Sequence, residues 1–140
     1  MNYKKFDDKY VVRIDKGEEI VESLRSFCKE KDITLGSVVG LGAVDEVKIG
    51  LFETSSKEYH GTELHGDHEI TNLTGNISTK DGEIYLHLHI NLADSKYNTY
   101  GGHLNYAVVS GTCELVITEI NGEVEREFNE EVGLNLYKFD

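Results

Sequence analysis

Apolar side chains recur at every third or fourth position in one segment near the N-terminus, and this spacing predicts an amphipathic helix. The helix is expected over about residues 17–31. Its apolar face would consist of Ile20, Val21, Leu24, Phe27 and Cys28. Asp15 stands three residues before Glu18, which is the spacing of a capping box that begins at an aspartate. Lys29 and Lys31 near the end suit the negative end of the helix dipole.

Most of the remaining chain consists of short β-rich runs separated by turn residues, and these runs predict strands. The runs cover residues 10–14, 36–43, 46–53, 69–78, 83–92, 104–110, 112–120 and 134–139. Turns are expected at Lys80-Asp81-Gly82 and at Asn121-Gly122, and the second is the strongest short hairpin signal in the chain. One helix with seven to eight strands predicts an α+β fold, in which the helix covers a mostly antiparallel sheet or partial barrel.

The chain has 140 residues, the size of one ordinary domain, and we expect a single domain over residues 1–140. Hydrophobic residues make up 39% and charged residues 29%, which is typical of a globular chain. With 14 Lys and Arg against 26 Asp and Glu, the formal net charge is −12. That charge argues against DNA binding by the domain alone, because affinity for DNA comes largely from phosphates neutralised by Lys and Arg.

Membrane, secretory and disulfide-based classes are also disfavoured. No uninterrupted apolar run reaches the roughly 18 residues of a membrane-spanning helix. Charged residues follow Lys4 and Lys5 where a signal peptide would need an apolar stretch, so we expect a cytoplasmic protein. Cys28 and Cys113 lie far apart and form no C-x-x-C pair, so we expect two small buried residues.

The segment Gly40-Leu41-Gly42 resembles the start of a dinucleotide-binding loop, but the rest of the motif is missing. The third glycine would fall at Asp45, and the following residues favour a strand where the motif requires a helix. We therefore expect no nucleotide cofactor, and we interpret the glycines as positions of close backbone packing or of a β-bulge.

The clearest candidate chemistry lies in the strand predicted at residues 83–92. Its residues alternate without a break, so that Leu86 and Leu88 share one face while His87 and His89 share the other. Side chains two residues apart on a strand point to the same side, about 6.5–7 Å apart, so two imidazoles could converge on one metal ion.

His103 could supply a third imidazole. The polar stretch between His89 and His103 is centred on Lys96, and a hairpin there would bring the two histidines level on neighbouring strands. Gly101 and Gly102 just before His103 permit an unusual turn or a close backbone approach. Three neutral imidazoles with an open fourth position are a ligand set of catalytic zinc, so the predicted metal site is His87, His89 and His103. The alternative is that the three histidines bind no metal and are simply polar residues on a solvent-facing strand.

Other candidate chemistry is weaker. His60, His65 and His68 lie in a polar stretch that we interpret as a loop leading into the strand near Glu69, and we expect them to be solvated. No nucleophile elbow, Walker loop or H-E-x-x-H motif occurs. The three arginines do not cluster in the sequence, and the C-terminal glutamates are most simply a solvated face.

The whole chain, over about residues 5–138, resembles the PPC domain (plants and prokaryotes conserved domain, also called domain of unknown function 296). The stretches that carry this resemblance are Gly17-Glu18, Gly40-Leu41-Gly42-Ala43, the run 69–77, and His87-Leu88-His89 followed by Gly101-Gly102-His103-Leu104. The resemblance implies one helix on an antiparallel sheet, a homotrimer like the prokaryotic stand-alone members, and a metal site at the three histidines with zinc as the ion. The same fold group includes acetolactate decarboxylase, a zinc enzyme with a similar three-histidine ligand set.

Plant members join this domain to AT-hooks and act in the nucleus, which is why bacterial members often carry a DNA-binding label. An AT-hook needs an Arg-Gly-Arg-Pro core, and this chain has no proline. The plant motif Gly-Arg-Phe-Glu-Ile-Leu corresponds here to residues 66–71, where Asp67 stands in place of the arginine. Both differences argue against DNA binding.

Three hypotheses follow. The first is a trimeric metal-binding domain with a small-molecule or enzymatic role, in which Glu69 or Glu114 could act as a general base. The second is a regulatory module that binds DNA or a protein partner. The third is a structural trimer whose histidines have no function. The sequence does not identify the substrate, the reaction or the metal.

Overall fold

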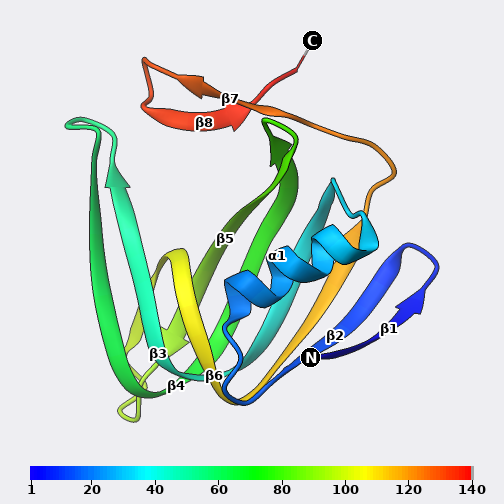
Figure 1. The fold of residues 1–140 in the computed structure, drawn as a ribbon. Helices are drawn as coiled ribbons and strands as arrows, with labels where there is room; N and C mark the ends of the chain where they lie inside the picture. The colour runs from blue at the N-terminus through cyan, green and yellow to red at the C-terminus, as the bar shows by residue number, and fades with distance from the viewer. Residues whose placement is uncertain (140) are drawn as a thin grey trace.

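The computed structural model describes residues 1–139 and consists of one helix and eight strands (Figure 1). In chain order these are β1 (Asn2–Phe6), β2 (Lys9–Asp15), α1 (Ile20–Lys31), β3 (Gly36–Glu53), β4 (Glu58–Lys80), β5 (Glu83–Ala93), β6 (Thr99–Glu119), β7 (Arg126–Asn129) and β8 (Leu134–Tyr137). The predicted α+β class, a helix with a mostly antiparallel sheet, is confirmed.

Six of the strands form one sheet that partly closes into a ring. Its order is β1-β2-β6-β3-β4-β5, every pair is antiparallel, and β5 pairs in addition with β6. The ring therefore runs through β6, β3, β4 and β5, while β1 and β2 extend it on one side. This arrangement confirms the predicted partial barrel. The two short strands β7 and β8 pair only with each other and lie at one end of the molecule (Figure 1).

Helix α1 lies across the sheet and closes its inner face, where the hydrophobic core sits (Figure 1). The buried residues of the helix are Ile20, Leu24, Phe27 and Cys28, as the apolar periodicity predicts, with Val21 partly buried against the same core. On the sheet side, alternate residues such as Val38, Leu88, Leu115 and Ile117 complete this core. The helix ends at Lys31, where Asp32 adopts a left-handed conformation with a φ of 57°.

The predicted start of the helix is wrong by about three residues. Glu19 is the N-cap, and its carboxylate accepts hydrogen bonds from the backbone N–H groups of Val21 (3.0 Å) and Glu22 (2.6 Å). Asp15 is instead the last residue of β2, and only half of the expected capping box forms, with its N–H donating to Glu18 Oε2 at 2.7 Å. The spacing of Asp15 and Glu18 correctly indicates that the two residues are hydrogen-bonded to each other. In the structure these hydrogen bonds close the turn that precedes the helix and do not cap the helix itself.

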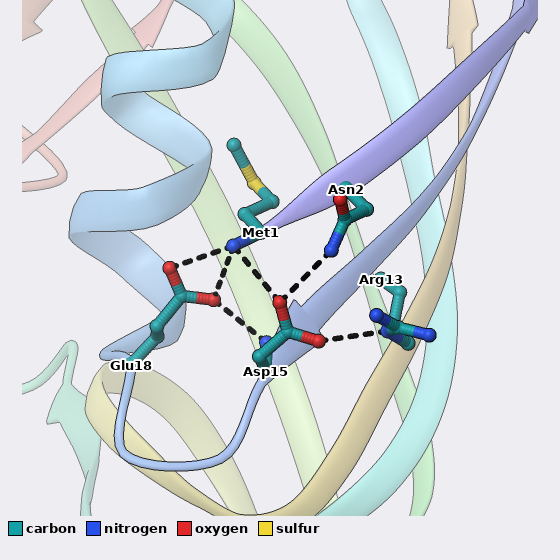
Figure 2. A network of polar contacts seen from close by, with 5 residues as sticks. All are labelled: Met1, Asn2, Arg13, Asp15 and Glu18. Carbon is teal, nitrogen blue, oxygen red and sulfur yellow. Dashed lines mark hydrogen bonds and ion pairs between the residues drawn. The ribbon is translucent and has the colours of Figure 1, made fainter.

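Figure 2 shows what the Asp15 side chain contacts in place of a helix end. Its carboxylate accepts from Asn2 and Arg13 and lies 3.1 Å from the Met1 amine, which also contacts Glu18 at 2.8 Å. Hydrogen bonding to this amine lowers the pKa of the Asp15 and Glu18 carboxyls. The network joins β1 to the turn that precedes the helix.

Several strand boundaries differ from the prediction because turn-like residues lie inside long strands. The expected runs 36–43 and 46–53 form one strand, β3, and the expected runs 104–110 and 112–120 both lie in β6, apart from the last residue, Ile120. Within β3 the register shifts between Gly40 and Gly42 and again between Val44 and Glu46, so bulges replace the expected break. A Cβ atom at Gly40 would lie 2.7 Å from the Glu114 backbone oxygen, which confirms the close-packing interpretation of this glycine.

Three other expectations are corrected. Residues 59–68, expected as a loop, belong to β4 and pair with β3; most of these β4 side chains are exposed on both faces, so this part of the strand shows no alternation. Strands β1 and β7 were not predicted. The Asn121-Gly122 hairpin does not form, because β6 pairs with β2 and β3 while the next strand, β7, pairs with β8.

The buried state of Cys28 and Cys113 is confirmed, and burial raises the pKa of both thiols to about 12. Within residues 1–139, the helix is neither long nor apolar enough to cross a membrane.

Candidate metal centre

The alternation predicted for β5 is the first element that builds the site. Leu88 and Ile90 are buried in the core and Leu86 packs against it, while His87 and His89 project from the opposite face. His87 is half-buried and His89 is exposed. The pattern of one strand therefore places two imidazoles side by side, as the sequence predicts.

The β5–β6 hairpin brings the third imidazole to the same face. His89 and His103 are direct cross-strand partners, which confirms the predicted pairing. The connecting turn is held by the Asp94 carboxylate, which accepts hydrogen bonds from the backbone N–H groups of Lys96 (2.8 Å) and Asn98 (3.0 Å). Beside His103, a Cβ atom at Gly102 would lie 2.6 Å from the Gly50 oxygen of β3, so this position requires glycine for close approach of the strands.

The three imidazoles converge. Ring centroids are 5.1 Å apart for His87 and His89, 5.4 Å for His87 and His103, and 5.7 Å for His89 and His103. One ring nitrogen of each residue lies within 4.8 Å of the corresponding nitrogens of the other two. Such a cluster could hold a metal ion, since nitrogens about 2.0–2.1 Å from a zinc ion are separated by distances of this order.

The surroundings of the cluster favour the neutral forms of His87 and His103. Burial lowers the pKa of His87 to about 4, with smaller contributions from His103, His89 and Arg126. Burial also lowers the pKa of His103, with a smaller contribution from His89. A metal ion requires the neutral form of histidine, so at neutral pH the rings of His87 and His103 are ready to act as ligands without first losing a proton.

The cluster lines a cavity of about 540 Å³. One wall is the β3–β4 hairpin, with Leu51, Phe52 and Tyr59, and the opposite wall comes from β8, with Leu134 and Leu136. The Tyr59 ring meets His103 edge-on, 6.2 Å between centroids, and its hydroxyl donates to Asn105. The cavity therefore combines a floor of three imidazoles with largely apolar walls, the usual composition of a small-molecule site.

Arg126 also lines this cavity, and the sequence analysis missed it. It is only 7% exposed, and its guanidinium stacks on Tyr85 and Tyr137, with the central carbon 4.8 and 4.2 Å from the ring centroids. Among residues 1–139 it is the only charged side chain in the lining besides the titratable histidines. No local pattern marks it, because its partners Asn76 and Ser78 lie about fifty residues earlier in the sequence.

The remaining histidines are not brought to the cluster. His60 and His65 are exposed, but on β4 rather than in the expected loop. His68 was expected to be solvated and is instead 8% exposed, with Nδ1 2.7 Å from the Gly66 oxygen and its ring against Tyr100. Glu53, Glu58 and His60 also lie close together, but all three are exposed. Glu69 and Glu114, the acids considered as a general base, do not line the cavity.

Fold and site together define a small α+β protein with a partly closed antiparallel sheet and a three-histidine cluster that could hold a metal ion. The family model described as the Plants and Prokaryotes Conserved (PCC) domain matches residues 1–121. The chain therefore belongs to the PCC family, also written PPC, which confirms the resemblance found in the sequence. No match was found among curated protein sequences.

Solved structures similar to this chain cover nearly its full length. A protein from Bacteroides thetaiotaomicron, provisionally described as DNA-binding, is 41% identical, with a TM-score of 0.96 over 99% of this chain and 96% of that one. A metal-containing protein from Archaeoglobus fulgidus is 33% identical, with a TM-score of 0.90 over 99% of both chains. A plant- and prokaryote-conserved protein from Pyrococcus horikoshii is 30% identical, with a TM-score of 0.86 over 99% of this chain and 94% of that one.

Proposed function

We propose that this protein is a zinc-binding domain that acts on a small molecule, with His87, His89 and His103 as the metal ligands. The observation that carries the proposal is the convergence of three imidazole nitrogens within 4.8 Å of one another. Two further facts support it: burial keeps His87 neutral, and the Archaeoglobus fulgidus relative is a metal-containing protein. Imidazole ligands suit zinc, although other divalent transition metals share this preference.

Three histidines leave a coordination position open for a substrate or water, which is the arrangement of catalytic rather than structural zinc. When bound, such an ion polarises a carbonyl or activates a water molecule. The protein's own residues orient the imidazoles through the β5–β6 pairing and surround the reacting region with the apolar walls of Leu51, Phe52, Leu134 and Leu136. These side chains give the space around the histidines a largely apolar lining.

Metal analysis of the purified chain tests this proposal. We expect about one zinc ion per chain, and a stabilisation of about 2.7 kcal/mol when free zinc exceeds its Kd a hundredfold. A triple variant with His87, His89 and His103 changed to alanine should lose both. A matched control with exposed His60 and His65 changed to alanine should keep them. Unchanged metal content in the triple variant would exclude this site.

We also propose that the chain forms a homotrimer, as the PPC resemblance implies. An exposed apolar row supports self-association: Val11 of β2, Val116 of β6 and Val39 of β3 lie directly opposite one another across three neighbouring strands. Leu41 extends this row on the same outer face. Contiguous exposed apolar side chains of this kind are typical of protein interfaces.

Light scattering coupled to gel filtration tests the trimer. The wild-type chain should show the mass of three copies, and Val39→Glu should lower it because a charge would be buried in the interface. Phe128→Glu is the matched control, since Phe128 is equally exposed but lies on β7, away from the row. A monomeric wild-type chain, or a trimer unaffected by Val39→Glu, contradicts this assignment.

A further inference from the structure

The balance of charge in the histidine cavity is uneven. Among residues 1–139, its lining contains the Arg126 guanidinium and no aspartate or glutamate. If the proposed zinc ion occupies the cluster, three neutral imidazoles leave its double charge in the same space. No acid in the described lining offsets either charge, so the charged groups that a ligand meets inside this cavity are positive.

The contacts of Arg126 do not neutralise it. Nε donates to Ser78 Oγ at 2.8 Å, one terminal nitrogen donates to the Asn135 carbonyl at 2.9 Å, and the other donates to Asn76 Oδ1 at 2.8 Å. All three acceptors are uncharged, and no ion pair joins Arg126 to an acid in residues 1–139. A guanidinium has five N–H groups, so two of them find no acceptor among these hydrogen bonds.

These contacts by themselves would explain an anchor between β7–β8 and the sheet, because Asn76 and Ser78 lie on β4 and Asn135 on β8. They do not explain why the residue at this position carries a positive charge, since its hydrogen-bond acceptors are all neutral. A nine-tenths buried cation without a counter-ion is costly, and stacking on Tyr85 and Tyr137 recovers only part of that cost. A bound anion would supply the missing negative charge.

The walls of the cavity restrict what kind of anion fits. Leu51, Phe52, Leu134 and Leu136 offer no partner for a highly charged or strongly hydrated group. A volume of about 540 Å³ accepts a molecule of metabolite size. An arginine fork matches the two oxygens of a planar carboxylate. The chemistry therefore fits a small monocarboxylate with an apolar body better than a multiply charged phosphate ester.

We infer that the histidine cavity binds a small monocarboxylate with an apolar body, and that Arg126 selects the carboxylate over a neutral group of the same shape. The part of this inference that concerns the metal's charge rests on the proposed function. The part that concerns Arg126 does not, because its charge is present in the metal-free chain as well.

Hexanoate and its neutral analogue hexanamide are suitable probes, measured by calorimetric titration with the zinc-loaded chain and again after chelation. In the zinc-loaded chain, hexanoate should bind at least about tenfold more tightly than hexanamide, in line with the strength of charge-assisted hydrogen bonds. After chelation the preference should be smaller but keep its direction. Loss of zinc binding, measured separately, would therefore contradict the proposed function without deciding the role of Arg126.

Arg126→Gln should reduce the preference for hexanoate about fivefold or more while zinc binding persists. Arg13→Gln is the matched control, because it removes the same charge from an exposed position on β2.

Since Arg126→Gln could unfold the β7–β8 segment, NMR of the wild-type chain gives a second readout. The Arg126 guanidinium signals should shift with hexanoate and not with hexanamide. Equal or absent binding of the two probes at millimolar concentration, an unchanged preference in a folded Arg126→Gln variant, or unshifted Arg126 signals would overturn the inference.

Discussion

His87 illustrates how the fold alters the chemistry of a single residue. Alternation along β5 places it on the side away from the core, where an isolated strand would leave it in water. In the folded chain it is half-buried beside two other imidazoles and Arg126, and its pKa falls to about 4. The sequence predicts where this side chain points, whereas its electrostatic state depends on neighbours from β6 and β7.

A pH dependence of stability follows for the metal-free chain. His87 has a pKa near 6.5 when unfolded and about 4 when folded, so the unfolded state binds more protons between these values. Above about pH 6.5 the residue is neutral in both states and has no effect. As the pH falls towards 4, the free energy of unfolding should decrease, and His103 should contribute in the same direction.

Urea unfolding in the presence of a chelator, at about pH 7 and about pH 5, measures this effect. His87→Gln should lose less stability than the wild-type chain between the two conditions, because glutamine does not titrate. His65→Gln, which changes an exposed residue outside the cluster, should behave as the wild type. An identical pH dependence in His87→Gln and the wild type would contradict the depressed pKa.

Among the secondary-structure elements, helix α1 shows how a correct periodicity can coexist with a wrong boundary. The apolar face is fixed by burial against β5 and β6, and the sequence reports it directly. The first residue is fixed by whichever side chain reaches the free N–H groups, and that residue is Glu19. Glu19 also accepts a hydrogen bond from the Ala107 N–H of β6 at 2.9 Å, a tertiary contact that no local spacing could reveal.

Glu19→Ala should therefore destabilise the protein by about 0.5–2 kcal/mol, the usual cost of losing an N-cap, with the contact to Ala107 favouring the upper end. The free energy of unfolding in urea measures this change. Glu30→Ala is the matched control, since Glu30 is an exposed glutamate near the other end of the same helix and should have little effect. Equal losses in the two variants would show that Glu19 does not cap the helix.

Strand β4 shows a case in which part of a strand leaves no hydrophobic pattern in the sequence. Its second half alternates against the core and was predicted at residues 69–78, whereas its first half extends beyond the core with polar residues on both faces. Backbone pairing with β3 makes this first half a strand, and backbone hydrogen bonds leave no trace in hydrophobicity. Tyr59 in this extension lines the histidine cavity, so the sequence did not reveal that part of the wall.

At the scale of the whole molecule, the net charge of −12 disfavours DNA binding and is compatible with binding of a small molecule. Relatives provisionally described as DNA-binding share this fold, but a shared fold does not transfer a ligand. Self-association into a trimer would concentrate the negative charge further. A polyanion such as DNA would then be repelled, while a small anion could still reach the positive cavity.

We therefore expect no complex with a short DNA duplex in a gel shift, even at low salt where phosphate contacts are strongest. The measurement should use the zinc-loaded chain, with a basic DNA-binding protein as the positive control. A complex that weakens steeply as salt is added would contradict this expectation and favour the regulatory function instead.

The sequence by itself determined the class of fold, the buried face of the helix, the alternation of β5 and the pairing of His89 with His103. These features depend on periodicity and on one short hairpin, both of which act over a few residues. The tertiary structure alone decided the pairing of β6 with β3, the cavity above the histidines and the position of Arg126. Each of these depends on contacts between distant segments, such as Arg126 with Asn76, and the energy of such contacts leaves no local pattern in the chain.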